Sequence, residues 1–236
     1  MLHLDDDQIE KVVGIPLLMA EKMATSKRIA PHFSYIEQLD ATRLIQLKES
    51  LTHLAEQVEI HITFMPFIIR ALSMALKEYP RVNSTYDMEK GILYIHKHHH
   101  VGIAITTSLG LIVPVLWDVQ TMSLETLIRS YDGLVKRSKS NTLDAKEMKG
   151  ATITVSNFGS LEGAGQWATP VINYPEVAIL AVARIHKSPI VKGDEVVVRD
   201  TLNLSWSFDH RVIDGNLAAA FSHRFSSLIE NPSKLL

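Results

Sequence analysis

A histidine flanked by acidic residues near the end of the chain is the group best suited to acid–base chemistry. The run is Asp209-His210-Arg211, and Asp214-Gly215 follows it. An imidazole has an ordinary pKa of about 6.5, so it can take up and release protons near neutral pH. The same pattern also fits a structural turn, in which Asp214 only caps a helix and His210 lies at a strand edge. The pattern by itself leaves both interpretations open.

Two predicted elements position this histidine. Apolar and polar residues alternate over Leu202–Phe208, which is typical of a half-buried strand. After Gly215, apolar residues recur at helical spacing until Asn231-Pro232 ends the pattern. A histidine fixed between a strand end and a helix start is well placed to act as a rigid general base.

A second group of histidines lies in the middle of the chain, and it could suggest a metal site. These are His96, His98, His99 and His100. Adjacent side chains of an extended segment point to opposite faces, so the four rings are not expected to converge. No acidic residue or cysteine stands at ligand spacing nearby in the sequence. We therefore predict a strand rim here and no metal.

Three glycines, Gly159, Gly163 and Gly165, indicate a flexible loop. They are weak evidence for a phosphate-binding loop, because neither a P-loop motif nor a dinucleotide-binding glycine motif is present. Nucleotide-dependent chemistry is therefore not expected.

The composition fits a globular protein and argues against several classes of partner. Of 236 residues, 46% are hydrophobic and 21% are charged. A net charge of −2 disfavours nucleic acid and anionic membranes as partners. The absence of cysteine excludes disulfides, thiolate metal sites and a cysteine nucleophile. An acidic start and the lack of a long apolar run predict no signal peptide, no membrane span and a cytoplasmic protein, or a mitochondrial-matrix one in a eukaryote.

Periodicity and breaker residues predict a mixed sheet layered with helices, that is, a two-layer α/β sandwich. We expect Leu17 and Leu18 of the first helix to face inward. The predicted helices span residues 15–27, 40–56, 63–78, 123–137, 143–148 and 215–231. The predicted strands span residues 31–39, 83–86, 92–95, 101–106, 111–116, 151–155, 176–183 and 202–207, with a hairpin near 193–194.

Two further segments accompany the histidine motif. The first reads Thr-Ile-Thr-Val-Ser-Asn-Phe-Gly over residues 152–159, and the second runs from Ala168 to Leu180 and contains Asn-Tyr-Pro-Glu. With Asp209–Gly215, they resemble in order and approximate spacing the hallmarks of the dihydrolipoamide acyltransferase catalytic domains of 2-oxo acid dehydrogenase complexes. The resemblance covers the chain from about Gly14 to its end. It implies the chloramphenicol acetyltransferase-like fold, with the active site at a trimer interface.

The resemblance also implies roles for three residues. His210 would be the general base that deprotonates a thiol, and Ser156 would donate a hydrogen bond to the oxyanion formed at the thioester carbonyl. Asp214 would fix the local geometry or assist proton transfer. Asp209 and Arg211 more simply hold the loop through their opposite charges. Without this context, the Ser156 hydroxyl would be read as a strand-end group bonded to the backbone.

Coenzyme A would be a substrate, and positions that match the family's CoA contacts are Lys48, Thr63, Ser156, Asn157 and Ser160. Lys48 could equally be a solvated helix charge. Two departures from the family concern the ligand channel. Thr106 stands where the family usually carries an aspartate, and the Gly159–Gly165 loop is about two residues longer than in some relatives.

The resemblance implies partners that this chain does not contain. We expect a homotrimer that assembles into a 24-mer or 60-mer core and binds the 2-oxo acid dehydrogenase and dihydrolipoamide dehydrogenase components. No lipoyl domain or peripheral-subunit-binding segment is recognisable, so we expect residues 1–13 to be a flexible segment and residues 14–236 to be the catalytic domain of a longer polypeptide. The apolar end, Leu235-Leu236, is expected to be exposed and to dock on a neighbouring subunit.

The acyl group is predicted less sharply. Segments 31–35, 64–67 and 205–207 resemble branched-chain enzymes, whereas residues 170–190 resemble acetyl-transferring enzymes equally well. We favour the branched-chain type, with the acetyl type as the alternative. A free-standing chloramphenicol acetyltransferase-like enzyme and a non-catalytic core subunit are further alternatives. Intact Ser156, His210 and Asp214 argue against the last of these.

Overall fold

The computed structural model describes residues 8–55, 60–108, 110–160, 163 and 165–236. One eight-stranded sheet organises the chain, with a main strand order of β1-β10-β8-β7-β4-β5. Strand β4 is parallel to β7 and β7 is parallel to β8, whereas β1, β8 and β9 pair antiparallel with β10. The strands are β1 (His32–Asp40), β4 (Val101–Thr107), β5 (Gly110–Ile112), β6 (Val115–Leu116), β7 (Ile153–Asn157), β8 (Ala178–Val182), β9 (His186–Lys192) and β10 (Glu195–Asp209).

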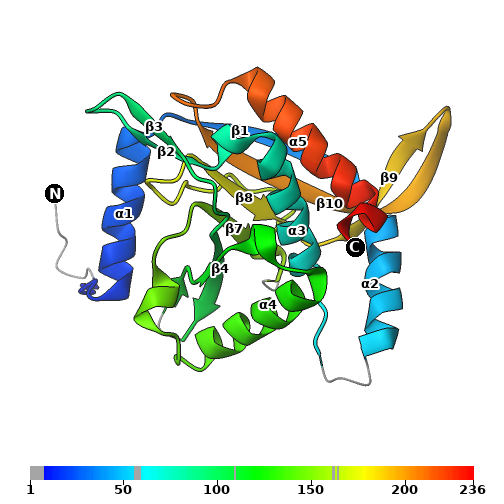
Figure 1. The fold of residues 1–236 in the computed structure, drawn as a ribbon, viewed down its shortest axis with the longest axis horizontal. Helices are drawn as coiled ribbons and strands as arrows, with labels where there is room; N and C mark the ends of the chain where they lie inside the picture. Colours follow the sequence, from blue (N-terminus) through cyan, green and yellow to red (C-terminus); the bar gives the residue numbers. More distant parts are fainter. Residues whose placement is uncertain (1–7, 56–59, 109, 161–162, 164) are drawn as a thin grey trace.

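Helices cover one face of this sheet, and a separate hairpin of β2 (Ser84–Asp87) and β3 (Ile92–Ile95) lies beside it. Figure 1 shows α3, α4 and α5 packed side by side over the central strands. The helices are α1 (Ile15–Ile29), α2 (Thr42–Ala55), α3 (Met65–Glu78), α4 (Leu124–Lys139) and α5 (Gly215–Glu230). The predicted two-layer mixed sheet is therefore confirmed. Among the described residues, no helix has the length and apolar character needed to cross a membrane.

The interface between β10 and α5 forms the aromatic centre of the core. Trp206 and Phe208 project from β10 and are fully buried. Their rings lie 5.0 Å and 6.3 Å from the ring of Phe221 on α5. Burying an aromatic side chain of this size contributes about 2–3 kcal/mol. The strand end that leads to His210 is therefore anchored in the most densely aromatic part of the protein.

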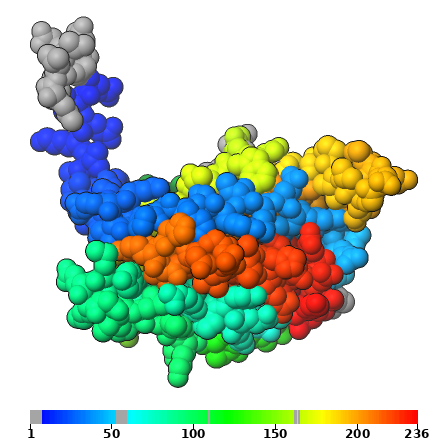
Figure 2. Space-filling model, turned by 90° about the horizontal axis from the view of Figure 1, so that it is seen from above, coloured from blue at the N-terminus to red at the C-terminus, as the bar shows by residue number. Residues whose placement is uncertain are grey.

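Strand β10 is longer than predicted. Its 15 residues join the hairpin strand after Gly193 to the alternating segment 202–207 in one element. Two valines of the outer part, Val196 and Val198, are exposed. Figure 2 shows the β9–β10 hairpin, in gold, extending from one end of the molecule, and the first described residues, in dark blue, extending near the other end.

Three smaller expectations are corrected. Leu17 and Leu18 face solvent in the single chain, with 41% and 65% exposure, because α1 contacts the sheet mainly beside β5. Leu235 is buried, and only Leu236 remains exposed at 67%. The predicted strand 111–116 is split into β5 and β6 at Pro114, which has no N–H for the ladder.

Candidate active site

His210 lies at the first position after β10, where the chain turns toward α5. Its backbone N–H donates to the carbonyl of Pro31 at 2.9 Å, and its ring packs on Phe33 with centroids 4.5 Å apart. The side chain is exposed. Within the part of the chain that the structure describes, its imidazole has no hydrogen-bond partner. The backbone is thus fixed while the ring nitrogens remain available to a group from outside the chain.

The two charged neighbours of His210 bind each other. The Arg211 guanidinium donates to both oxygens of Asp209, at 2.6 Å from Nη2 to Oδ2 and 3.0 Å from Nε to Oδ1. Asp209 is 1% exposed, and it also accepts from the Arg211 backbone N–H at 3.0 Å. The hydrogen bonds to Asp209 raise the pKa of Arg211. This pair fixes the turn around His210, as the sequence indicated.

Asp214 caps α5. Its Oδ1 accepts from the Leu217 backbone N–H at 2.8 Å, which satisfies one of the free donors at the helix start. The residue is exposed, and its second oxygen points to no protein donor among the described residues. The capping role considered from the sequence is therefore present, whatever else the carboxylate does.

Ser156 lies on β7, and the strand register separates it widely from His210. Ser156 pairs with Ala181 of β8, and Ala181 pairs with Ser205 of β10. His210 comes five residues after Ser205. With a rise of about 3.3 Å per residue and about 4.8 Å between strands, the two side chains are roughly 20 Å apart in one chain. Serine and histidine from the same subunit cannot meet on one thioester.

Most of the expected CoA-contacting residues lie around the carboxyl end of β7, the end at which Ser156 also lies. Asn157 and Ser160 line a cavity of about 210 Å³, together with Phe64 and Arg184. The Lys48 ammonium lies 5.5 Å from the centroid of the Phe64 ring, at the margin of this region. A cavity of this size accommodates part of a CoA molecule and not the whole of it. The predicted residues are thus brought near one another, although Ser156, Thr63 and Lys48 adjoin the cavity and are not among its lining residues.

Thr63 immediately precedes Phe64, and its hydroxyl is buried with no hydrogen-bond partner among the described residues. An unpaired buried hydroxyl costs about 1–3 kcal/mol, so a ligand group that pairs with it would be favoured. This observation fits the expected contact of Thr63 with CoA.

Gly159 and Arg184 are two members of this region that the sequence did not indicate as contacts. A Cβ atom on Gly159 would lie 2.2 Å from the Arg184 backbone nitrogen, so only glycine fits there. The Arg184 Nε donates to the Gly159 carbonyl at 2.9 Å. Gly159 is therefore buried against the end of β8 and is not simply part of a flexible loop. Residues 161, 162 and 164 of the longer loop lie outside the described residues.

The prediction for the histidine cluster needs a correction. His98 and His100 point to the same side, and Asp118 joins them, with candidate ligand atoms all within 4.8 Å of one another. His99 points away and hydrogen bonds to Ser73 at 2.8 Å, and burial lowers its pKa to about 4. The four rings do not converge, as predicted, but an acidic partner is present. Spacing of two residues on an extended segment was the signal for a shared face.

Glu176 is a buried carboxylate that the sequence did not single out. It is 3% exposed, and burial raises its pKa to about 7. Thr154 Oγ1 and Asn173 Nδ2 donate to its Oε1 at 2.9 Å and 2.6 Å. It lies beside a cavity of about 430 Å³ that α1 and β5 also line. Near neutral pH this group can therefore hold its proton.

Thr106, on β4, is exposed and pairs with Leu111 of β5. The position that is commonly acidic in the resembled family is therefore uncharged here. Any ligand passing this edge of the sheet meets a hydroxyl and not a carboxylate.

Comparisons with known proteins agree on one family. The model of the 2-oxoacid dehydrogenases acyltransferase catalytic domain matches residues 5–236. The dihydrolipoyllysine-residue acetyltransferase component of the pyruvate dehydrogenase complex of Staphylococcus aureus is 40% identical over 228 residues, which are 96% of this chain and 52% of that protein. The chain therefore spans about half the length of the curated relatives it matches.

Solved structures give the same result. The cubic core of a pyruvate dehydrogenase multienzyme complex has a TM-score of 0.92 and 32% identity, covering 100% of this chain and 98% of that one. The same values hold for the dihydrolipoamide acetyltransferase of Azotobacter vinelandii, in a study of the role of one serine, one histidine and one asparagine in its mechanism.

A chloramphenicol acetyltransferase, at 13% identity and a TM-score of 0.58, shares the fold alone; it covers 89% of this chain and 94% of that one. Its fold is the one predicted from the sequence. The match over nearly the whole chain and the relatives above 30% identity together show that the chain belongs to the 2-oxoacid dehydrogenase acyltransferase family, in its catalytic domain.

Proposed function

We propose that this chain transfers an acyl group between dihydrolipoamide and CoA at an active site shared by two subunits. The observation that carries the proposal is the separation of Ser156 from His210 within one chain. Each lies at an accessible end of a well-anchored strand, and the His210 ring packs on Phe33 without a hydrogen bond to any described residue. Relatives of this family are acetyltransferase components of a multienzyme complex.

The chemistry follows from the two side chains. A free thiol with a pKa of about 8.5 is mostly protonated at neutral pH, so His210 takes its proton as the thiolate sulfur attacks the thioester carbonyl carbon. The carbonyl oxygen becomes an oxyanion, and the Ser156 hydroxyl donates a hydrogen bond to it. The intermediate then collapses, the bond to the second sulfur breaks, and that sulfur takes the proton back from His210.

Three residues would support this reaction without touching the reacting atoms. The Asp209–Arg211 pair holds the turn, and the Asp214 cap fixes the start of α5. Asparagine occurs in place of this aspartate in the resembled family, which fits a positioning role for Asp214. In the Azotobacter protein the studied histidine and asparagine are four positions apart, as His210 and Asp214 are here.

For the acyl group, we propose acetyl. The branched-chain preference drawn from short segments is not supported by the relatives, whose names specify acetyl transfer and the pyruvate complex. The test is turnover of acetyl-, isobutyryl-, isovaleryl- and succinyl-CoA with dihydrolipoamide. The highest kcat/KM is expected for acetyl-CoA, and a tenfold preference for isobutyryl- or isovaleryl-CoA would restore the branched-chain assignment.

We further propose that CoA is bound at the cavity between Phe64 and Arg184, with contacts from Asn157 and Ser160 and with Lys48 near a phosphate. The unpaired Thr63 hydroxyl supports this location. Lys48→Ala is expected to raise the KM for acetyl-CoA about tenfold, a change of about 1.4 kcal/mol, with little change in kcat. Lys136→Ala is the matched control, because Lys136 lies on α4 and forms an exposed ion pair with Asp132.

A trimer would supply the shared site. We propose that eight trimers assemble into a 24-mer and not a 60-mer, because the core of a relative is cubic. Exposed apolar side chains at Leu17, Leu18, Val196 and Val198 are consistent with burial in such an assembly. Binding of a lipoyl domain and of the dehydrogenase components belongs to this proposal, as does a cytoplasmic or mitochondrial-matrix location.

Subunit mixing tests the shared site directly. Ser156→Ala and His210→Ala chains should each be nearly inactive alone. When the two variants are exchanged in equal amounts, about a quarter of the subunit boundaries take their serine from a His210→Ala chain and their histidine from a Ser156→Ala chain. These boundaries have both groups intact, so about a quarter of the parent activity should return. Each variant taken through the same exchange by itself is the control. No recovery after verified exchange would place both residues in one chain and overturn the proposal.

A further inference from the structure

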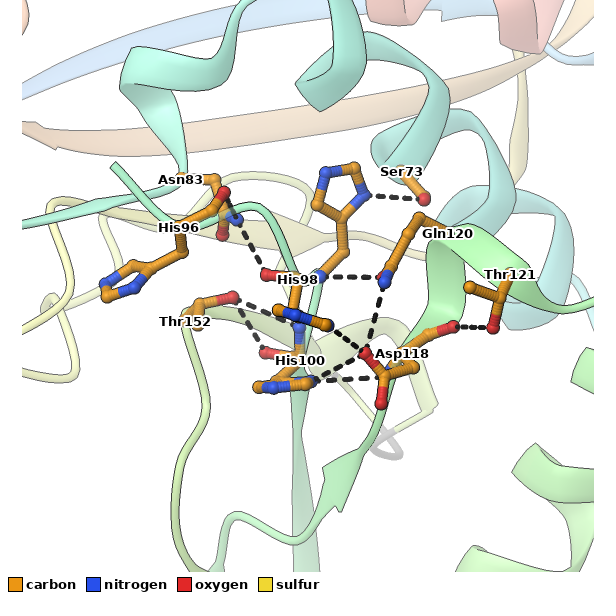
Figure 3. A network of polar contacts seen from close by, with 10 residues as sticks. Ser73, Asn83, His96, His98, His100, Asp118, Gln120, Thr121 and Thr152 are labelled. Carbon is orange, nitrogen blue, oxygen red and sulfur yellow. Dashed lines mark hydrogen bonds and ion pairs between the residues drawn. The ribbon is translucent and has the colours of Figure 1, made fainter. Parts of the chain in front are cut away.

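The segment that leads into β4 and the turn that follows β6 meet on one side of the sheet. Val101 pairs with Leu116, so the residues just outside this pairing, His100 and Trp117, lie next to each other. Asp118 follows in a left-handed conformation, with φ of 52°, which aspartate tolerates better than most residues. Figure 3 shows the result, with the side chains of His98, His100 and Asp118 directed toward one another.

The candidate ligand atoms of this group all lie within 4.8 Å of one another, close enough for one ion to contact all three. The distance from His98 Nδ1 to Asp118 Oδ1 is 2.6 Å, and the distance from His100 Nδ1 to the same oxygen is 3.9 Å. Two ligands of a tetrahedral ion with bonds of about 2.1 Å are about 3.4 Å apart, which lies between these values. The first distance would therefore have to lengthen by about 0.8 Å and the second to shorten by about 0.5 Å.

To bind an ion, the exposed His98 side chain would have to move most, because His100 is held by its packing. The His98 side chain is 67% exposed, whereas that of His100 is 15% exposed and its ring packs on Trp117 with centroids 4.3 Å apart. His100 Nδ1 now accepts the Asp118 backbone N–H at 3.1 Å, so this ring presents an acceptor lone pair to the group. A bound ion would take the place of that N–H.

Surrounding contacts hold the other two ligands in position. Gln120 Nε2 donates to Asp118 Oδ1 at 3.1 Å, while Gln120 Oε1 accepts from the His99 backbone at 2.8 Å. The Thr152 backbone N–H donates to the His100 carbonyl at 2.8 Å, and its hydroxyl accepts from the His100 N–H at 3.1 Å. Such outer contacts orient metal-ligating side chains in established sites.

We propose that His98, His100 and Asp118 form a binding site for one divalent transition-metal ion, with Zn²⁺ as the reference ion. Two imidazoles and a carboxylate are the ligand set that suits Zn²⁺, Co²⁺ and Ni²⁺, and water completes the coordination from the open side. Mg²⁺ and Ca²⁺ are disfavoured, because they prefer oxygen ligands.

The site would act on the structure and not on the acyl transfer. β4 and β7 run parallel, with Val101 beside Ile153 and Ala104 beside Ser156. His98 and His100 precede β4 and Asp118 follows β6, so the proposed ligands lie at the opposite end of the paired strands from Ser156. A bound ion would tie the segment before β4 to the turn after β6, and through Thr152 to the chain that enters β7.

Zn²⁺ titration of the untagged, assembled protein by calorimetry tests the proposal. We expect saturable binding of one ion per chain, with affinity reduced at least tenfold in both His98→Asn and Asp118→Asn. Asn tolerates the left-handed conformation at position 118, so that variant should fold. His96→Asn is the matched control, because His96 belongs to the same segment but bonds to Thr85 and not to the group.

Two readouts accompany the titration. Saturating Zn²⁺, about 100-fold above Kd, should raise the Tm of the parent and of His96→Asn by about 5–10 °C and leave that of His98→Asn nearly unchanged. Ni²⁺ should quench the fluorescence of Trp117, and Trp117→Phe should abolish that part of the signal. Absence of saturable binding up to about 1 mM Zn²⁺, or equal binding by His98→Asn and the parent, would overturn the site.

Discussion

Two regions of this protein combine histidine with aspartate, and they use the combination in opposite ways. At the end of β10, His210 has Asp209 beside it and Asp214 four residues later, yet neither carboxylate hydrogen bonds to its ring. Before β4, His98 and His100 have no aspartate nearby in the sequence, yet both face Asp118. Closeness in sequence therefore does not show which carboxylate contacts a histidine ring: the Asp209–Arg211 pair was predicted correctly, but the contact of Asp118 with His98 and His100 was missed.

The difference lies in what the carboxylates have to satisfy locally. Asp209 is buried and needs a cation, which Arg211 supplies, and Asp214 accepts from a free backbone N–H at the start of α5. Both are therefore engaged, and the His210 ring is left for an external group. The Asp118 side chain is 44% exposed and pairs with no lysine or arginine among the described residues, and its Oδ1 is shared by His98 and Gln120.

The largest expected effect separates the two regions by activity. His210→Ala should lower kcat by roughly 10²–10⁴, the usual value of a positioned general base, and should leave the oligomer intact. His98→Ala should keep kcat within about twofold, because the ring lies at the far end of the paired strands. Steady-state kinetics with acetyl-CoA measures both. If His210→Ala were about as active as the parent, the histidine at the end of β10 would have a structural role only, like the group of His98, His100 and Asp118.

The next effect concerns the buried pair beside His210. Asp209→Asn should lower the free energy of unfolding by about 3 kcal/mol, because it leaves the Arg211 guanidinium, with a side chain only 15% exposed, without its anion. Adding Arg211→Leu should recover most of the loss. Urea unfolding of both variants measures this. A single variant as stable as the parent would show that the turn does not depend on the pair.

A buried carboxylate that forms no ion pair among the described residues provides a third case and a pH test, with Lys22 as the nearby cation. Burial raises the pKa of Glu176 from 4.5 to about 7, so between these values the folded chain keeps a proton that the unfolded chain has lost. Stability from this group is therefore present at low pH and falls as pH rises, by about 3 kcal/mol in total.

Glu176→Gln keeps an oxygen for Thr154 and Asn173 but cannot ionise. The free energy of unfolding should therefore decline less between pH 4.5 and pH 8 in this variant than in the parent. Glu125→Gln is the control: the Glu125 side chain is 72% exposed, so the pH dependence of unfolding should match that of the parent. Parallel curves for Glu176→Gln and the parent would mean that the carboxylate ionises freely in the folded chain.

The smallest effect concerns Asp214. Asp214→Ala removes the cap of α5 and should cost about 1 kcal/mol of stability, whereas Asp214→Asn keeps the acceptor and should cost little. If the carboxylate also assists His210, the asparagine variant should have a lower kcat at unchanged stability. Thermal unfolding and kcat, measured on both variants, distinguish a cap from a cap with a second role.

Local patterns predicted the elements around the candidate active site well. Apolar periodicity placed the helix after Asp214 and the strand that ends before His210, and both are confirmed. Proline and glycine marked most of the breaks between elements. These features follow from the backbone and from neighbours a few residues apart, so the sequence contains all the information needed to see them.

The sequence by itself therefore determined the helices, most of the strands, the fold class and the family motifs at Ser156 and His210. Only the tertiary structure decided that these two residues lie roughly 20 Å apart in one chain, because that distance depends on strand order and register. It likewise brought Asp118 to His98 and His100, and pressed Gly159 against the backbone of Arg184. Such contacts join elements that are distant in the chain. The pattern of apolar and polar residues within each element is the same whether these contacts form or not, so it cannot predict them.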